Sequence, residues 1–204
     1  MQENKTYNHF MRMKKSTLTT LIFFLSFTLL KAQKTDTCII KTSLGEMTIE
    51  LYSKKAPLTV ANFLKYVDAH LYDGTSFFRT VRLDNQPKDS IKIEVVQGGH
   101  VNAQKAFAPI MLETTKQTGL HHLGGTLSMA RSTPNSAASD FFICINDQPS
   151  LDYGGKRNND GQGFAAFGKV IAGMEVVRKI QQLYPGQEQY INPTVLILNI
   201  IRKK

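Results

Sequence analysis

The chain has 204 residues, of which 42% are hydrophobic and 20% are charged, an ordinary composition for a globular domain. Its length favours one domain and at most two. Fourteen Gly and seven Pro residues are too few for a collagen-like or Pro-rich fibrous chain. Two Cys residues exclude a disulfide-rich scaffold and a metal cluster that needs three or four thiolates.

The formal charge of +9 could indicate nucleic-acid binding, but the distribution of the charges argues against it. Five of the 25 Lys and Arg residues lie within residues 1–32, and the others form no basic block beyond the tail at 202–204. Scattered charges are typical of a solvated surface. We therefore expect a mildly basic surface and no nucleic-acid partner.

The N-terminal segment is predicted to be a secretory signal. Basic residues precede an uncharged, largely apolar run at 18–30, and Ala32 follows as a small residue at a possible cleavage point. The run is short for a membrane span, although a short anchor or a buried helix would have a similar pattern. We expect a signal peptide at 1–32 and an exported mature chain, periplasmic or secreted, without a stable membrane span.

The mature chain begins with a predicted hairpin and a helix. A β-branched run at 37–42 is followed by a turn and by residues 47–51, where apolar and polar side chains alternate. Pro57 then opens a segment whose apolar residues recur at helical spacing as far as Val67. Each of these elements has one face to bury.

The rest of the chain is mostly strand-like, with a second helix predicted from Gly173. Strands are predicted at 75–82, 91–98, 126–131, 140–145, 164–171 and 194–201. Helices and strands do not alternate as in a parallel sheet, and closure into a barrel hides the edges of an antiparallel one. We therefore predict a mainly β domain at 33–204, a closed eight-stranded antiparallel β-barrel capped by two α-helices.

The common signatures of nucleophilic, phosphate-binding and metal chemistry are missing from the sequence, and we expect neither a metal nor another cofactor. The adjacent His121 and His122 would point to opposite faces of a strand, so an ordinary hydrogen-bonded role is expected for them. Cys144 lies in an apolar run without an adjacent base and is expected to be buried. Export would permit a Cys38–Cys144 disulfide, while two buried thiols are the alternative.

Five short motifs in a fixed order carry a family resemblance. They are FFR at 77–79, QGG at 97–99, GTLSMAR at 125–131, PNSAASDFFI at 134–143 and GFAAFGKV at 163–170. In this order the sequence resembles the cyclophilin family of peptidyl-prolyl cis/trans isomerases over roughly residues 37–202. The resemblance implies an eight-stranded barrel capped by two helices and a substrate that contains an X–Pro peptide bond.

The resemblance also implies the site residues. Arg79 matches the catalytic arginine of the family, with Arg82 as the nearby alternative, and Gln97 matches the active-site glutamine that orients the substrate backbone or the arginine. The residues that match substrate-binding positions are Val95, Ala130, Arg131, Phe142, Leu151 and Phe164. Proline-containing polypeptides are the expected partners, and the protein is expected to be a monomer.

Departures from the family pattern leave alternatives open. Glu94, Asp140 and Ser150 stand where many members have a pocket phenylalanine, a second glutamine and a tryptophan, and residues 83–90 form a polar insertion. An isomerase that assists protein folding is the leading interpretation. A non-catalytic proline-peptide binding module or chaperone is the second. An unrelated antiparallel barrel for small apolar ligands is the third.

Overall fold

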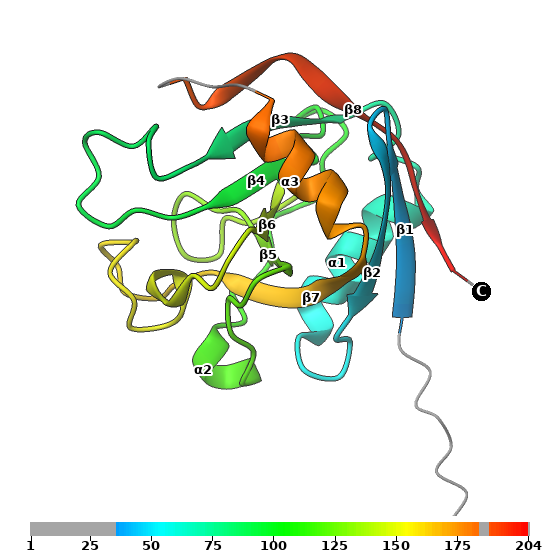
Figure 1. Ribbon diagram of the computed structural model, residues 1–204. Helices are drawn as coiled ribbons and strands as arrows, with labels where there is room; N and C mark the ends of the chain where they lie inside the picture. Colours follow the sequence, from blue (N-terminus) through cyan, green and yellow to red (C-terminus); the bar gives the residue numbers. More distant parts are fainter. Residues whose placement is uncertain (1–35, 184–187, 204) are drawn as a thin grey trace, which may run out of the picture. The chain divides into compact units, whose positions relative to one another are not determined.

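The computed structural model describes residues 36–183 and 188–203, and the predicted signal peptide lies outside these ranges. Within them, eight strands close into one barrel in the order β1-β2-β7-β5-β6-β4-β3-β8, and every neighbouring pair is antiparallel (Figure 1). The strands are β1 Asp36–Thr42, β2 Gly45–Leu51, β3 Ser76–Val81, β4 Val95–Gly98, β5 Thr126–Met129, β6 Phe141–Cys144, β7 Ala165–Ala172 and β8 Tyr190–Arg202.

Both predicted helices are present, together with two shorter ones that were not predicted. The helices are α1 Pro57–Asp68, α2 Thr115–Thr118, α3 Met174–Gln182 and the 3-10 turn η1 Pro149–Leu151. Helix α1 packs against β7 and β8, and α3 packs against β2, β3 and β4. None of the helices in the described ranges is long and apolar enough to cross a membrane.

Aromatic side chains link α1 to the interior of the barrel. Pro57 occupies the first helical turn, where the missing N–H costs no hydrogen bond. Phe63 lies on the buried face of the same helix and is fully buried. Its ring centroid lies 5.2 Å from that of Tyr72, 5.5 Å from that of Phe141 and 5.2 Å from that of Phe167. Such close aromatic pairs add to the stability gained from burial itself.

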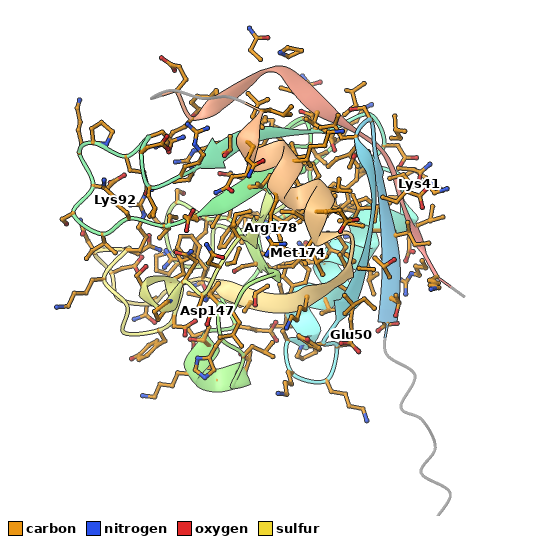
Figure 2. All side chains as sticks on the ribbon, viewed as in Figure 1. Lys41, Glu50, Lys92, Asp147, Met174 and Arg178 are labelled. Carbon is orange, nitrogen blue, oxygen red and sulfur yellow. The ribbon has the colours of Figure 1, made fainter. Side chains whose placement is uncertain are left out.

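Strand β4 begins later than the apolar alternation predicted. Ile93 is buried, yet its backbone pairs with a side chain instead of a neighbouring strand. The Ile93 N–H donates to Oε1 of Gln86 at 3.1 Å, and Nε2 of Gln86 donates to the Ile93 carbonyl at 2.8 Å. Gln86, in the insertion between β3 and β4, thus supplies the hydrogen bonds that the backbone of Ile93 would otherwise make within a strand. Figure 2 shows Lys92 on the same loop, and its Nζ donates to the Leu83 carbonyl at 2.8 Å.

Candidate active site

A β-bulge in β3 turns Arg79 to the outer face of the barrel. Phe77 is fully buried in the interior and pairs with Gly98 on β4. Strict alternation would send Arg79 inward as well. The pairing instead shifts by one residue, so that Arg79 lies opposite Gln97 and both side chains are partly exposed. Bulges of this kind re-aim side chains, and here the bulge keeps a guanidinium out of the apolar core.

The same outer face continues across β4 and β6. Val96 on β4 belongs to the interior core, whereas Val95 belongs to a second apolar cluster outside it. Gln97 pairs in register with Phe142 on β6, which belongs to the second cluster too. Val95 and Gln97 therefore share one orientation on β4. The register places Arg79, Gln97 and Phe142 side by side on three neighbouring strands.

Hydrogen bonds that Arg79 donates to two glutamines fix its guanidinium. Its Nη1 donates to Oε1 of Gln97 at 3.0 Å. Its Nε and Nη2 donate to Oε1 of Gln189 at 3.1 Å and 2.7 Å. Burial lowers the pKa of Arg79 from its ordinary value, but an arginine side chain stays charged in proteins. One N–H of Nη1 and one of Nη2 have no partner among the described residues.

Five of the six residues predicted to bind the substrate belong to one compact apolar cluster on the same outer face as Arg79. Val95, Phe142 and Leu151 are buried, and Ala130 and Phe164 pack against them with part of their surface exposed. The exposed portions of Ala130 and Phe164 are therefore the apolar surface that a ligand can reach. Three further members of the cluster were not assigned from the sequence: Val81, Ile93 and Cys144.

The Arg131 side chain holds Phe164 in place. The side chain is only 1% exposed. Its Nε donates to the Gly163 carbonyl at 2.8 Å, and its Nη1 donates to the Asp160 carboxylate at 2.7 Å. The guanidinium carbon lies 5.2 Å from the centroid of the Phe164 ring, and that ring meets Phe142 edge-on at 5.3 Å. That Ala130 and Arg131 bind the substrate stays a prediction. The Ala130 N–H donates to the Asp140 carbonyl at 2.8 Å.

The buried His122 lies behind the apolar cluster as part of a histidine–carboxylate network. The His122 ring stacks on Phe142 with centroids 6.0 Å apart. Its Nδ1 lies 2.6 Å from Oδ1 of Asp152, and its Nε2 lies 2.9 Å from Oγ of Ser128. Nδ1 of His121 lies 2.8 Å from the other oxygen of the same carboxylate. The two histidines thus converge on Asp152, which the sequence did not reveal because it lies far along the chain.

Asp152 is expected to make the protein sensitive to acid. Burial raises the pKa of its carboxyl group, but hydrogen bonds from His122 and His121 outweigh this effect, so the net shift is downward. Because the folded-state pKa is lowered, the ionised group stabilises the fold above its unfolded-state pKa, and this contribution is lost as the pH falls through the folded-state value. We expect Asp152→Asn to be less stable than the wild type at pH 7 and to lose less stability between about pH 5 and pH 2.

Denaturant unfolding across a pH series measures this difference. Asp147→Asn is the matched control, because that carboxylate is exposed and accepts from the Gly124 N–H at 2.8 Å without a histidine partner. Equal slopes of the free energy of unfolding against pH in Asp152→Asn and the wild type would contradict the prediction.

A polar groove opens beside Arg79. It has a volume of about 640 Å³ and is lined by Gly74, Thr75, Ser76, Phe78, Arg79, Gln97, His100, Asp140 and Tyr190. Asp140 is thus on the rim of the site, and its Oδ1 lies 3.2 Å from Nδ1 of His100. The residue that replaces the family's second glutamine therefore places a carboxylate on the groove wall, 27% exposed.

Glu94 does not line the apolar cluster, contrary to what its alignment with the pocket phenylalanine implied. Its carboxylate accepts from Nδ2 of Asn146 at 2.9 Å and from Nε2 of Gln181 on α3 at 3.4 Å. Glu94 directly precedes β4, and its carboxylate is directed toward Gln181 of α3 instead of the apolar cluster. The neighbouring Ile93 supplies the apolar side chain to the cluster.

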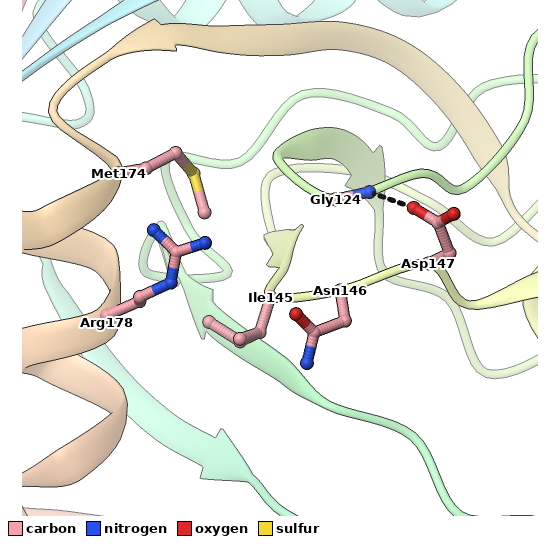
Figure 3. A pocket seen from close by; sticks show the side chains of 6 residues that line it. All are labelled: Gly124, Ile145, Asn146, Asp147, Met174 and Arg178. Carbon is pink, nitrogen blue, oxygen red and sulfur yellow. Dashed lines mark hydrogen bonds between the residues drawn. The ribbon is translucent and has the colours of Figure 1, made fainter.

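A second groove lies between α3 and the loop after β6. Figure 3 shows Met174 and Arg178 of α3 facing Ile145 and Asn146, with Asp147 across the groove. Its volume is about 550 Å³. None of the predicted catalytic or substrate-binding residues lines it, so we place the candidate site at Arg79 instead.

Both cysteines are free and buried. Cys38 lies in the barrel interior and Cys144 in the outer cluster. Burial raises the pKa of Cys38 to about 12 and also raises the pKa of Cys144 above its ordinary value, so neither thiol is a ready nucleophile. Across residues 36–183 and 188–203, no group of three or more His, Cys, Asp and Glu side chains is arranged to hold a metal ion.

Comparisons with known proteins identify the family and agree with the fold. The family model described as cyclophilin type peptidyl-prolyl cis-trans isomerase/CLD matches residues 37–201. A peptidyl-prolyl cis-trans isomerase of Acinetobacter baylyi is 40% identical over 146 residues, which are 69% of each chain. Peptidyl-prolyl cis-trans isomerase A of Dickeya dadantii is 38% identical over 179 residues, 84% of this chain and 86% of the relative.

Solved structures give the same architecture. A cyclophilin type peptidyl-prolyl cis-trans isomerase of Cryptosporidium parvum is 22% identical and superposes with a TM-score of 0.67 over 84% of this chain and 99% of its own. A structure of that protein in the presence of the dipeptide Ala-Pro gives a TM-score of 0.64 at 21% identity, over 82% of this chain and 99% of its own. At such low identity the likeness shows the fold alone.

Proposed function

This chain belongs to the family of cyclophilin type peptidyl-prolyl cis-trans isomerases, and from that premise we propose how its residues act on the X–Pro bond. Its enzyme class is peptidyl-prolyl cis/trans isomerase, which excludes the unrelated small-ligand barrel. The peptide bond resists rotation by about 18–20 kcal/mol because the nitrogen lone pair is delocalised into the carbonyl. Without a catalyst, X–Pro isomerisation takes roughly 10–100 s at 25 °C.

Arg79 weakens this resonance in the proposed mechanism. A guanidinium N–H donates a hydrogen bond toward the prolyl nitrogen as that nitrogen becomes pyramidal, and the lone pair is then held on nitrogen instead of in the C–N bond. The two N–H groups of Arg79 without a partner in the described part of the chain are the available donors. The supporting observation is this fixed guanidinium beside an apolar cluster and an open groove. No covalent intermediate is needed.

The apolar cluster and the groove would hold the two sides of the bond. The pyrrolidine ring packs on the exposed portions of Ala130 and Phe164, and the flanking peptide lies along the groove that contains Gln97 and Asp140. Proline-containing polypeptides are therefore the proposed partners. The Ala-Pro dipeptide used with the Cryptosporidium parvum structure supports this ligand class.

Exchange NMR on an Ala-Pro peptide tests the proposed function. The purified protein should increase the cis/trans exchange rate of the peptide at concentrations far below that of the substrate. Binding of the peptide without any increase in exchange would instead favour the non-catalytic binding module or chaperone.

We further propose that the protein is exported and assists the folding of exported polypeptides. The proposal rests on the basic and apolar pattern of residues 1–32. Intact-mass analysis of the protein from the cell envelope and medium should show a chain that lacks these residues. A full-length mass on the exported material would contradict cleavage and favour a membrane anchor.

A further inference from the structure

An irregularity between β3 and β8 brings a second glutamine to Arg79. Phe77 pairs with Val195, but Arg79, two residues later, pairs with Tyr190, so that residues 191–194 are left out of the pairing. The Thr80 N–H then donates to the Gln189 carbonyl at 2.7 Å. The residue just before β8 is thereby fixed next to Arg79 through the backbone.

The Gln189 side chain completes the support of the guanidinium. Its single oxygen accepts from both Nε and Nη2 of Arg79, at 3.1 Å and 2.7 Å, while Gln97 accepts from Nη1. The two acceptors hold opposite ends of a planar group. With Gln97 alone, the guanidinium could still turn about its remaining side-chain torsions.

The insertion before β4 holds Gln189 in its turn. Nε2 of Gln189 donates to the Asn85 carbonyl at 2.9 Å. Asn85 is 1% exposed, and its Nδ2 donates to the carbonyls of Thr80 at 3.1 Å and Glu188 at 3.2 Å. The amide of Gln189 is thereby fixed at both its oxygen and its nitrogen, so the side chain is a rigid acceptor.

We propose that Gln189 is a positioning residue for the isomerase reaction: it holds the plane of the Arg79 guanidinium so that the two unpaired N–H groups face the prolyl nitrogen. The inference rests on the proposed role of Arg79. Gln189 does not touch the substrate in this scheme and acts through Arg79 alone. The polar insertion at 83–90 thus contributes to activity through Asn85.

The variant Gln189→Met tests the proposal, because methionine is similar in length but lacks the amide oxygen. We expect kcat to fall about tenfold, with KM within about twofold of the wild type, since a misaligned catalytic group slows the reaction more than it weakens binding. Exchange NMR at several peptide concentrations gives both constants. Glu188→Ala is the matched control, because this neighbouring side chain is exposed and only its backbone carbonyl takes part in the network.

A double-mutant cycle separates positioning from general loss of structure. In an Arg79→Ala background, Gln189→Met should have no further effect on turnover, because two residues that act as a unit are not additive. The Arg79 Nε–H signal should also exchange faster with water in Gln189→Met than in the wild type. Additive losses in the cycle would overturn the proposal and leave Gln189 with a structural role.

The outcomes also distinguish this inference from the proposed function. Wild-type turnover in Gln189→Met together with strong loss in Arg79→Ala would refute the positioning role but keep the catalytic one. Full activity in both single variants would refute the proposed role of Arg79 itself. A lower unfolding midpoint in Gln189→Met, with kcat and KM both changed, would also count against positioning.

Discussion

Arg79→Ala is expected to lower kcat/KM for an Ala-Pro peptide about 100-fold, which corresponds to about 2.7 kcal/mol of transition-state stabilisation. The variant removes the donor that would localise the lone pair on the prolyl nitrogen. It leaves Gln97 and Gln189 in place without the charge they orient. The fold should be little affected, because the guanidinium lies on the outer face and supports no part of the barrel interior.

Arg178→Ala is the matched control for this measurement. Its guanidinium is exposed on α3 in the second groove, away from the predicted site residues (Figure 3). The control should have wild-type turnover, and both variants should unfold at the wild-type denaturant midpoint. If Arg79→Ala were as active as the wild type, the catalytic assignment would be wrong, and Arg82→Ala would be the next variant to measure.

Phe142→Ala is expected to reduce the free energy of unfolding by about 3–5 kcal/mol, the usual cost of emptying a buried aromatic position. The ring is 4% exposed and lies between His122, stacked at 6.0 Å, and Phe164, edge-on at 5.3 Å. Its removal leaves both rings without their partner. The surface proposed to receive the pyrrolidine ring would lose its support at the same time, so isomerase activity should fall even at temperatures where the variant is folded.

Phe164→Ala separates these two effects. Phe164 is partly exposed and belongs to the same cluster. Its loss should cost less stability than the loss of Phe142, since less apolar surface is returned to water, but it should raise KM because the ring is part of the accessible surface. Calorimetric or denaturant unfolding and exchange NMR of both variants give the comparison. Equal destabilisation of the two would contradict the burial argument.

Periodicity predicted α1 and β2 well because each has one buried face. Helix α1 follows the spacing from Pro57 to Val67, and the alternation at 47–51 became the buried side of β2. The same reasoning assigned Ile93 to a strand, because a buried residue in an alternating run looks the same whether its backbone pairs with a strand or with the amide of Gln86. The local sequence pattern does not distinguish a backbone that pairs with a strand from one that pairs with a side chain.

The site was predictable where it depended on motif and orientation. Arg79 and Gln97 do lie opposite each other, and the substrate-binding candidates on β4 and β6 share one face. Gln189 was missed because it lies far along the chain from Arg79, and nothing in its neighbours marks it. Glu94 was placed wrongly because alignment by position assumed that its side chain points to the apolar cluster.

The bulge in β3 couples the register of this strand to the charge of Arg79. Phe78, the extra residue, is partly exposed, and its ring centroid lies 5.9 Å from that of His100. If the full-length strand paired without the bulge, Phe78 would lie opposite Gln97, and the guanidinium would be directed into a packed interior beside Phe77 and Phe141, where an unpaired charge is very costly. The charge that the proposed chemistry requires therefore also disfavours a one-residue slip of β3 against β4.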